Sequence, residues 1–171
     1  MNTKLNQLIT VLDCDGLDEA LMALDQTQGH DREIRLYAVW CARQVESLMT
    51  DKRSISALDV AERFATGLAT ADELDIACAA AEAAAAEAAA FTAKATQWKV
   101  EWNAQQEVAL AAAHAAASCV AARVSARNAA CFAIGAAAGA AGTEWAEQCD
   151  VAEAAREAQE KRLREACAAI D

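Results

Sequence analysis

Apolar side chains recur at intervals of three and four residues along most of the chain, which is the spacing of one face of an α-helix. Between residues 1 and 68 this pattern comes in short runs, each ended by turn-forming residues. Gly67 follows the fourth run, where a glycine commonly ends a helix. We therefore expect four short helices, over 4–12, 18–25, 31–49 and 54–66, with Asp31 and Ser54 as N-caps of the last two.

From Thr70 onward the pattern predicts long helices. Thr70 and Glu73 have the spacing of a capping box, in which each side chain bonds the backbone N–H of the other residue. Polar residues after this point form only narrow stripes, so we expect these helices to be largely covered by their neighbours. The predicted boundaries are 70–103, 106–138 and 144–170, with Gly139, Gly142 and Thr143 at the second break and 106–138 as the most buried helix.

Alanine dominates the composition, with 49 alanines among 171 residues, against six glycines and no proline. Alanine has the highest helix propensity, and the scarcity of turn formers excludes an all-β domain. We expect one all-α domain over 1–171, an alanine-rich helical bundle with short N-terminal helices over 1–68 and three long helices over 70–171. Because alanine buries little area, a few large side chains should anchor the core. The candidates are Trp40, Phe64, Phe91, Trp98, Trp102, Phe132 and Trp145.

The chain is strongly acidic, with 26 Asp and Glu against 15 Lys and Arg and a formal net charge of −11. Such a surface repels the phosphates of nucleic acids and of anionic lipids, so neither direct nucleic-acid binding nor membrane association is expected. The first residues lack the apolar stretch of a signal peptide, and the uncharged run 128–143 is short for a membrane span. We expect a cytoplasmic protein whose acidic surface either maintains solubility or meets a basic protein partner.

Recognisable catalytic and metal-binding motifs are missing from the sequence. Its seven cysteines include no Cys-x-x-Cys pair. Neither of its two histidines, His30 and His114, lies at the distance from a cysteine that zinc sites require. We interpret the cysteines as reduced, buried thiols, His30 as a surface residue and His114 as a hydrogen-bonded core residue. The prediction is a protein that is not an enzyme, with no catalytic residues, no metal site and no cofactor.

Arg123 and Arg127 stand out on the almost uncharged segment 104–142. They lie one helical turn apart, so their guanidinium groups can act together. One interpretation is that they pair with carboxylates of a neighbouring helix, such as Glu82 or Glu87. The alternative is a small anion-binding pocket for a phosphate or a nucleotide, through which the protein would sequester that ligand.

A second cluster of charge lies at the start of the predicted helix 31–49. It is either a solvated face with internal salt bridges or a partner surface, because arginine and large aromatic residues commonly anchor interfaces. The candidate partner-binding residues are Arg32, Arg35, Tyr37, Trp40 and Arg43. The amphipathic last helix, 144–170, offers another alternative, a structural protein that forms homo-oligomers through this helix.

Two stretches of the sequence resemble a known family. One is Leu-Tyr-Ala-Val-Trp-Cys-Ala-Arg-Gln-Val over 36–45, and the other runs through 51–53 and 57–67 to Ala-Thr-Ala-Asp-Glu-Leu over 69–74. Together with the alanine-rich tail, they resemble the alanine-rich, all-helical immunity-protein family of bacteria and phages, best over about residues 31–100. The resemblance implies an all-helical, non-catalytic protein that binds another protein, and it carries over no catalytic residues.

The expected function is therefore that of a non-catalytic binding protein. Its role would be that of an immunity protein, an antitoxin or a phage-encoded inhibitor, which neutralises a toxin, a defence protein or a host protein through an acidic helical surface.

Overall fold

The computed structural model describes residues 3–27, 29–97, 104–121, 125–141 and 145–168. Within these ranges the chain is an all-α bundle without strands, which confirms the predicted fold class. Its helices are α1 (Thr3–Cys14), α2 (Leu17–Asp25), α3 (Asp31–Arg43), α4 (Lys52–Ala65), α5 (Ala71–Gln97), α6 (Ala104–Val120), α7 (Ala126–Ala140) and α8 (Trp145–Ala168), with a 3-10 turn, η1 (Glu46–Leu48), between α3 and α4. Among these described helices, none has the length and apolarity needed to cross a membrane.

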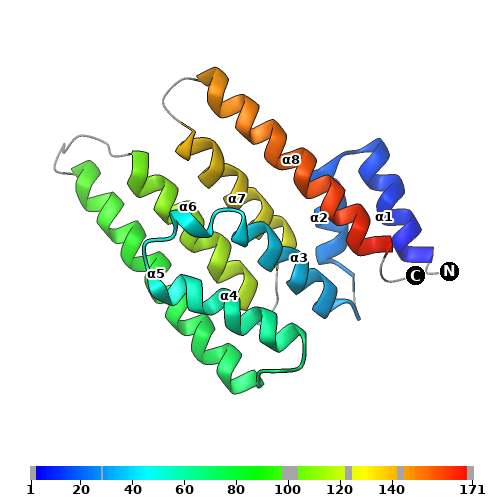
Figure 1. Cartoon of the computed structure of the whole chain (residues 1–171), viewed down its shortest axis with the longest axis horizontal. Helices are drawn as coiled ribbons and strands as arrows, with labels where there is room; N and C mark the ends of the chain where they lie inside the picture. The colour runs from blue at the N-terminus through cyan, green and yellow to red at the C-terminus, as the bar shows by residue number, and fades with distance from the viewer. Residues whose placement is uncertain (1–2, 28, 98–103, 122–124, 142–144, 169–171) are drawn as a thin grey trace.

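Helix α6 lies in the middle of the bundle (Figure 1), where it contacts α3, α4, α5 and α7. Its buried side chains are small, because this segment consists mainly of alanine. Small side chains allow helix axes to approach closely. A Cβ atom added at Gly139 of α7 would lie only 2.8 Å from Cγ2 of Val108 of α6, so glycine is needed for this approach.

Helices α1 and α2 form a hairpin beside α7 and α8 (Figure 1). Leu8, Leu12, Leu21 and Leu24 are buried on its inner side. Asp13 in the last turn of α1 also pairs with Arg164 of α8, with 2.6 Å between Oδ1 and Nη2. The hairpin is therefore held against α7 and α8 by both apolar packing and an ion pair.

The turn between α4 and α5 follows the sequence prediction. Gly67 has a φ of +76°, and its N–H donates to the carbonyl of Phe64, so it ends α4 as expected. The capping box of α5 is confirmed by hydrogen bonds from Thr70 N to Glu73 Oε2 (2.8 Å) and from Glu73 N to Thr70 Oγ1 (3.2 Å).

Two predicted N-caps are wrong. Asp51, not Ser54, caps α4, because its carboxylate accepts a hydrogen bond from Arg53 N at 2.8 Å. A carboxylate is favoured there by the positive end of the helix dipole. Ser54 lies inside the helix and is fully buried. Asp31 is the first residue of α3, and His30 occupies the N-cap position without a side-chain cap bond.

The predicted helix 106–138 is two helices, so the described residues after Thr70 form four helices rather than three. Ser125 interrupts the helix with an extended backbone (φ −120°, ψ 106°), and its Oγ accepts a hydrogen bond from Asn128 N at 3.1 Å. Serine is a favoured N-cap residue, but the continuous alanine periodicity on both sides hid this signal. Thr143, expected at the break before the last helix, lies outside the described residues.

Within the described residues the core consists mainly of leucine and alanine, with Tyr37 as its largest fully buried side chain. Phe91 and Phe132 expose 59% and 37% of their surface, so neither anchors the interior. Trp40 and Phe64 are partly buried at its edge, while the side chains of Trp98, Trp102 and Trp145 lie outside the described part. The largest fully buried side chains are Tyr37, Leu21, Leu58 and Leu163.

Candidate functional site

Arg127 pairs with a carboxylate of a neighbouring helix, although not with the predicted Glu82 or Glu87. Its guanidinium binds Asp18 of α2, with 2.7 Å from Nε to Oδ1 and 3.0 Å from Nη2 to Oδ2. Hydrogen bonding to Arg127 lowers the pKa of Asp18, as expected for a bidentate contact. Arg123 lies outside the described residues.

Asp25 occupies the backbone donors that an external anion would use at the start of α7. It accepts hydrogen bonds from Ser125 Oγ (2.8 Å), Ala126 N (2.8 Å) and Arg127 N (3.4 Å). Free N–H groups and the helix dipole make this end of a helix a favourable place for a carboxylate. The anion-binding groups of this region are therefore taken by Asp18 and Asp25 of the chain itself, which argues against an anion pocket at Arg127.

Replacing Asp25 by alanine is expected to lower the free energy of unfolding by about 2 kcal/mol, because three donors at the start of α7 lose their acceptor. Asp15, an exposed residue of the turn between α1 and α2, provides the matched control. Its alanine variant should change the free energy by less than about 0.5 kcal/mol in the same urea titration. Equal effects of the two substitutions would contradict the structural role of Asp25.

Arg35, one of the five candidate partner-binding residues, is buried with 4% of its surface exposed. Its Nη1 donates to the carbonyl of Cys119 and, at 3.3 Å, to that of Ala121, at the end of α6. The guanidinium also lies 5.3 Å from the ring centre of Phe64. Burial lowers the pKa of Arg35. This side chain joins α3 to α6 and is not available to a partner at the surface.

Tyr37 is buried as well, with 2% exposed, and its hydroxyl donates to the carbonyl of Gln159 in α8 at 3.3 Å. Trp40 is half-buried. Arg32 is exposed, and its Nε donates to the carbonyl of Ala65 at 3.1 Å. The structure corrects the sequence interpretation here, because the five candidates do not form one exposed surface.

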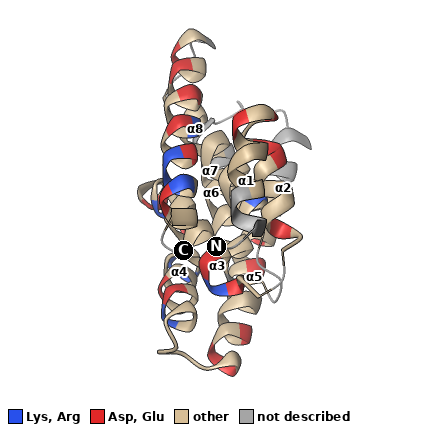
Figure 2. Cartoon of the chain, turned by 90° about the vertical axis from the view of Figure 1, so that its right-hand side faces the viewer, with Lys and Arg blue, Asp and Glu red and all other residues tan. Residues whose placement is uncertain are grey.

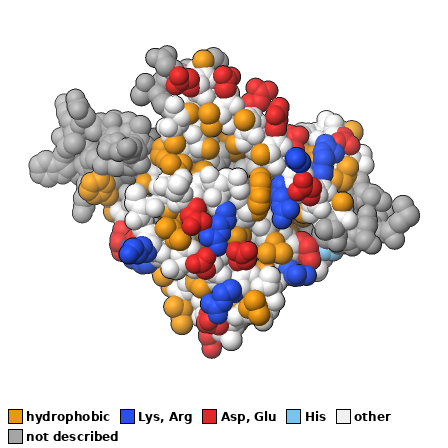
Figure 3. Space-filling model, in the orientation of Figure 1, with side chains coloured by type: hydrophobic (Ala, Val, Ile, Leu, Met, Phe, Trp, Pro, Cys, Tyr) orange, Lys and Arg blue, Asp and Glu red, His pale blue; other side chains and the backbone are white. Residues whose placement is uncertain are grey.

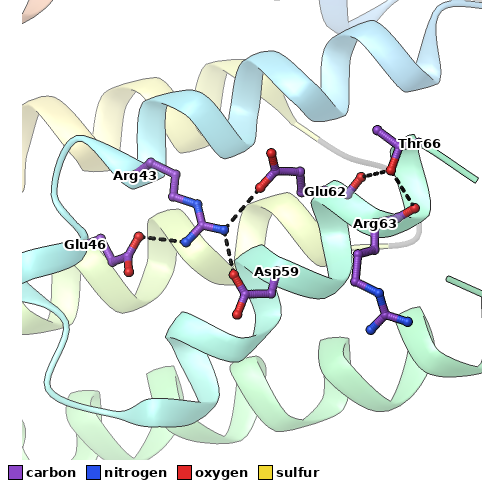
Figure 4. Close-up of polar contacts among 6 residues, drawn as sticks. All are labelled: Arg43, Glu46, Asp59, Glu62, Arg63 and Thr66. Atoms are coloured by element: carbon purple, nitrogen blue, oxygen red, sulfur yellow. Dashed lines mark hydrogen bonds and ion pairs between the residues drawn. The ribbon is translucent and has the colours of Figure 1, made fainter. Parts of the chain in front are cut away.

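Arg43 belongs to a salt-bridged face between α3 and α4 (Figure 4). Its guanidinium contacts Glu46 Oε2 at 2.7 Å, Asp59 Oδ1 at 2.6 Å and Glu62 Oε2 at 3.1 Å. Burial alone would lower the pKa of Arg43, but the hydrogen bonds to these carboxylates raise it above its usual range. One guanidinium faces three carboxylates, so this cluster carries excess negative charge.

Helix α5 is an edge helix that packs on α4 and α6 along one side. The expectation that it is largely covered is wrong, since only Leu74, Ala81, Ala84 and Ala85 are buried among residues 71–91. Its free side carries exposed apolar residues at alternating steps of three and four, which we call the α5 face. The α5 face consists of Ile76, Ala79, Ala83, Ala86 and Ala90.

Large hydrophobic residues are unusually exposed around the α5 face. Leu68, in the turn before α5, exposes 70% of its surface, Ile76 exposes 72%, and Phe91, next to the end of the face, exposes 59%. Single apolar residues at a surface are common and need no explanation. Their grouping along α5 and the turn before it is typical of an interaction surface.

Acidic residues border the α5 face. Asp72, Asp75 and Glu82 make no ion pair with any residue that the structure describes. The first basic residue of α5 is Lys94, near the far end of the helix. Figure 2 marks acidic positions along the ribbon of the first turns of α5, and both basic and acidic positions on the neighbouring α4. The remaining two acids of the helix are paired with arginines of α4, namely Glu73 with Arg63 and Glu87 with Arg53.

Two other described surfaces differ from the α5 face. On the face of α3, α4 and α8 that Figure 3 shows, basic and acidic side chains lie next to one another. The first turns of α8 are acidic and extend beyond the other helices (Figure 2), but no described side chain there is a large exposed hydrophobic residue. Exposed apolar residues and unpaired acids thus occur together at α5.

The remaining candidate groups are the cysteines and His114. None of the seven cysteines forms a disulfide, and only Cys41, Cys119 and Cys167 are buried, so the expectation of buried thiols is wrong for the other four. Burial raises the pKa of Cys41 to about 12, so its thiol is protonated at neutral pH. His114 stacks on Phe132 with 5.0 Å between ring centres. Among the described residues, no group of three His, Cys, Asp or Glu side chains could hold a metal ion.

Sequence reasoning missed the α5 face because alanine is compatible with both a buried and an exposed position. The signal that could have indicated it is Ile76, a large apolar residue that follows Asp75 directly and lies one turn after Asp72. Comparisons of the chain with protein-family models, with curated proteins and with solved structures found no significant match.

Proposed function

We propose that this protein is a non-catalytic binding protein of the immunity or antitoxin kind, including a phage-encoded inhibitor, which neutralises a basic partner protein through an acidic helical surface. The α5 face is the centre of that surface. The observation that carries the proposal is the exposure of Ile76, at 72%, in line with small residues and beside acids that have no ion-pair partner among the described residues.

The geometry suits recognition of a helix or loop that carries both apolar and basic side chains. Alanines at positions 79, 83, 86 and 90 let a partner backbone approach closely, and Ile76 supplies the large side chain that such contacts need. Asp72, Asp75 and Glu82 would attract lysine or arginine and speed association. Neutralisation then follows from covering the partner's own basic functional surface.

The experiment is a quantitative affinity purification from the source cells with the wild-type chain and with Ile76→Glu. The charged variant should lower the affinity for the partner about 30-fold or more, because truncated or charged hot-spot residues cost about 2 kcal/mol. Met22→Glu is the matched control, since Met22 lies on α2 with 40% exposed, away from α5. A partner retained by the control and lost by Ile76→Glu supports the proposal.

Neutralisation is tested by expressing the captured partner in cells with and without this protein. Growth or partner activity should change with the wild type and the Met22→Glu variant but not with Ile76→Glu. Binding that is the same for all three chains, or that does not weaken at high salt, contradicts a role for the acidic α5 surface.

A further inference from the structure

A cleft lies between α3 and α8, on the side of the molecule away from α5. Its volume is about 320 Å³, which falls within the range of about 300–1,000 Å³ typical of small-ligand sites. Its lining residues are Arg32, Glu33, Leu36, Tyr37, Arg162, Glu165 and Ala166. The cleft thus combines an apolar wall with two arginines that come from different helices.

The guanidinium of Arg162 is only weakly satisfied by the chain itself. Its Nε is buried and has no hydrogen-bond partner among the described residues. Its Nη1 has one carboxylate contact, with Glu165 Oε2, at a long distance of 3.4 Å. Its Nη2 makes no hydrogen bond to any described residue, so this atom keeps donors for an acceptor in the cleft.

Arg32 supplies the second cation of the cleft. Its Nε is held by the carbonyl of Ala65 at 3.1 Å, which fixes the position of the guanidinium. Neither of its Nη atoms makes a hydrogen bond within the part of the chain that the structure describes. Those atoms keep free donors for an incoming carboxylate.

The two acids on the cleft do not neutralise these arginines fully. Glu165 exposes 51% of its side chain and holds Arg162 only by the long contact, so a ligand carboxylate can replace it. Glu33 makes no ion pair with Arg32 or Arg162, and its contact with Nδ1 of His30, at 4.0 Å, is outside hydrogen-bond distance. Tyr37 forms a rigid apolar wall, because its hydroxyl is held by Gln159.

We infer that this cleft binds a small organic carboxylate with an apolar body. The carboxylate would accept hydrogen bonds from Arg162 and Arg32, and the apolar body would pack on Leu36, Tyr37 and Ala166. Guanidinium groups match the geometry of carboxylates well, and the apolar wall selects against a bare inorganic anion. This site is independent of the proposed partner surface on α5.

The test is titration of the full chain with 4-phenylbutyrate, followed by calorimetry and by backbone amide chemical shifts. Two further probes separate the contribution of the negative charge from that of the apolar body. They are 4-phenylbutanol, which has no charge, and inorganic phosphate, which has no apolar body. We expect saturable binding of 4-phenylbutyrate, with shifts confined to α3 and α8. The alcohol and phosphate should bind at least tenfold more weakly.

Arg162→Gln and Arg32→Gln should each weaken binding of 4-phenylbutyrate about tenfold, the loss of one charged hydrogen-bonding partner. Arg164→Gln is the matched control, because Arg164 lies on α8 but binds Asp13 outside the cleft. Arg32 is exposed, so its variant keeps the test valid even if Arg162→Gln does not fold. Absence of saturation, equal binding of the alcohol, shifts outside α3 and α8, or unchanged affinity in both cleft variants would overturn the inference.

Discussion

Replacement of Arg35 by methionine is expected to lower the free energy of unfolding by about 3 kcal/mol. Methionine fills a similar volume but donates no hydrogen bond. The carbonyls of Cys119 and Ala121 would then lose their donor at the negative end of α6. The contact with the ring of Phe64 would be lost as well.

A buried ion pair can often be replaced by apolar side chains at little cost, but this arginine differs because its partners belong to the backbone and stay polar after the substitution. Urea titration followed by circular dichroism measures the effect. Arg32→Met is the matched control on the same helix, since Arg32 is exposed and makes one hydrogen bond. A loss below about 1 kcal/mol for Arg35→Met, similar to the control, would show that the buried guanidinium is not needed to join α3 and α6.

Replacement of Ala112 by leucine is expected to have a similar effect, a loss of about 3 kcal/mol, because the added carbons have no space. Ala112 is fully buried on α6, one turn after Val108, whose Cγ2 already excludes a Cβ atom at Gly139 of α7. Helices that pack this closely can admit a leucine only by moving apart. Other alanine contacts along the same interface would then be lost.

The same substitution on the free side of α5 is the control. Ala83→Leu places leucine at an exposed position of a helix, where the change in the free energy of unfolding should stay within about 0.5 kcal/mol. The two variants add the same atoms and differ only in surroundings. If Ala112→Leu were tolerated equally well, the interface between α6 and α7 would have to be loosely packed.

Features set by neighbouring residues could be predicted from the sequence. The capping box of Thr70 and Glu73 and the stop at Gly67 depend on groups within four residues of one another, and both are confirmed. The all-α class follows from the abundance of alanine and the lack of proline. Local chemistry was sufficient for these features because no distant residue competes with it.

Features set by distant residues could not be predicted. Helix α7 is capped in part by Asp25, which lies 100 residues away from Ser125 in the sequence. The same holds for Arg35, which reads as a surface residue of a charged helix but bonds backbone groups 84 and 86 residues further on. The candidate surface on α5 was missed because alanine gives no sign of which side of a helix faces the core.

The hairpin of α1 and α2 has a consequence for how the chain is made. Its leucines are covered in the folded protein by α7 and α8. Asp25 accepts a hydrogen bond from Ser125, which is synthesised 100 residues later. At a synthesis rate of about 5–20 residues per second, the ribosome needs roughly 5–20 s to add those residues. During that time the emerging hairpin exposes Leu8, Leu12, Leu21 and Leu24, and this exposed apolar surface makes the segment prone to aggregation in a newly made chain.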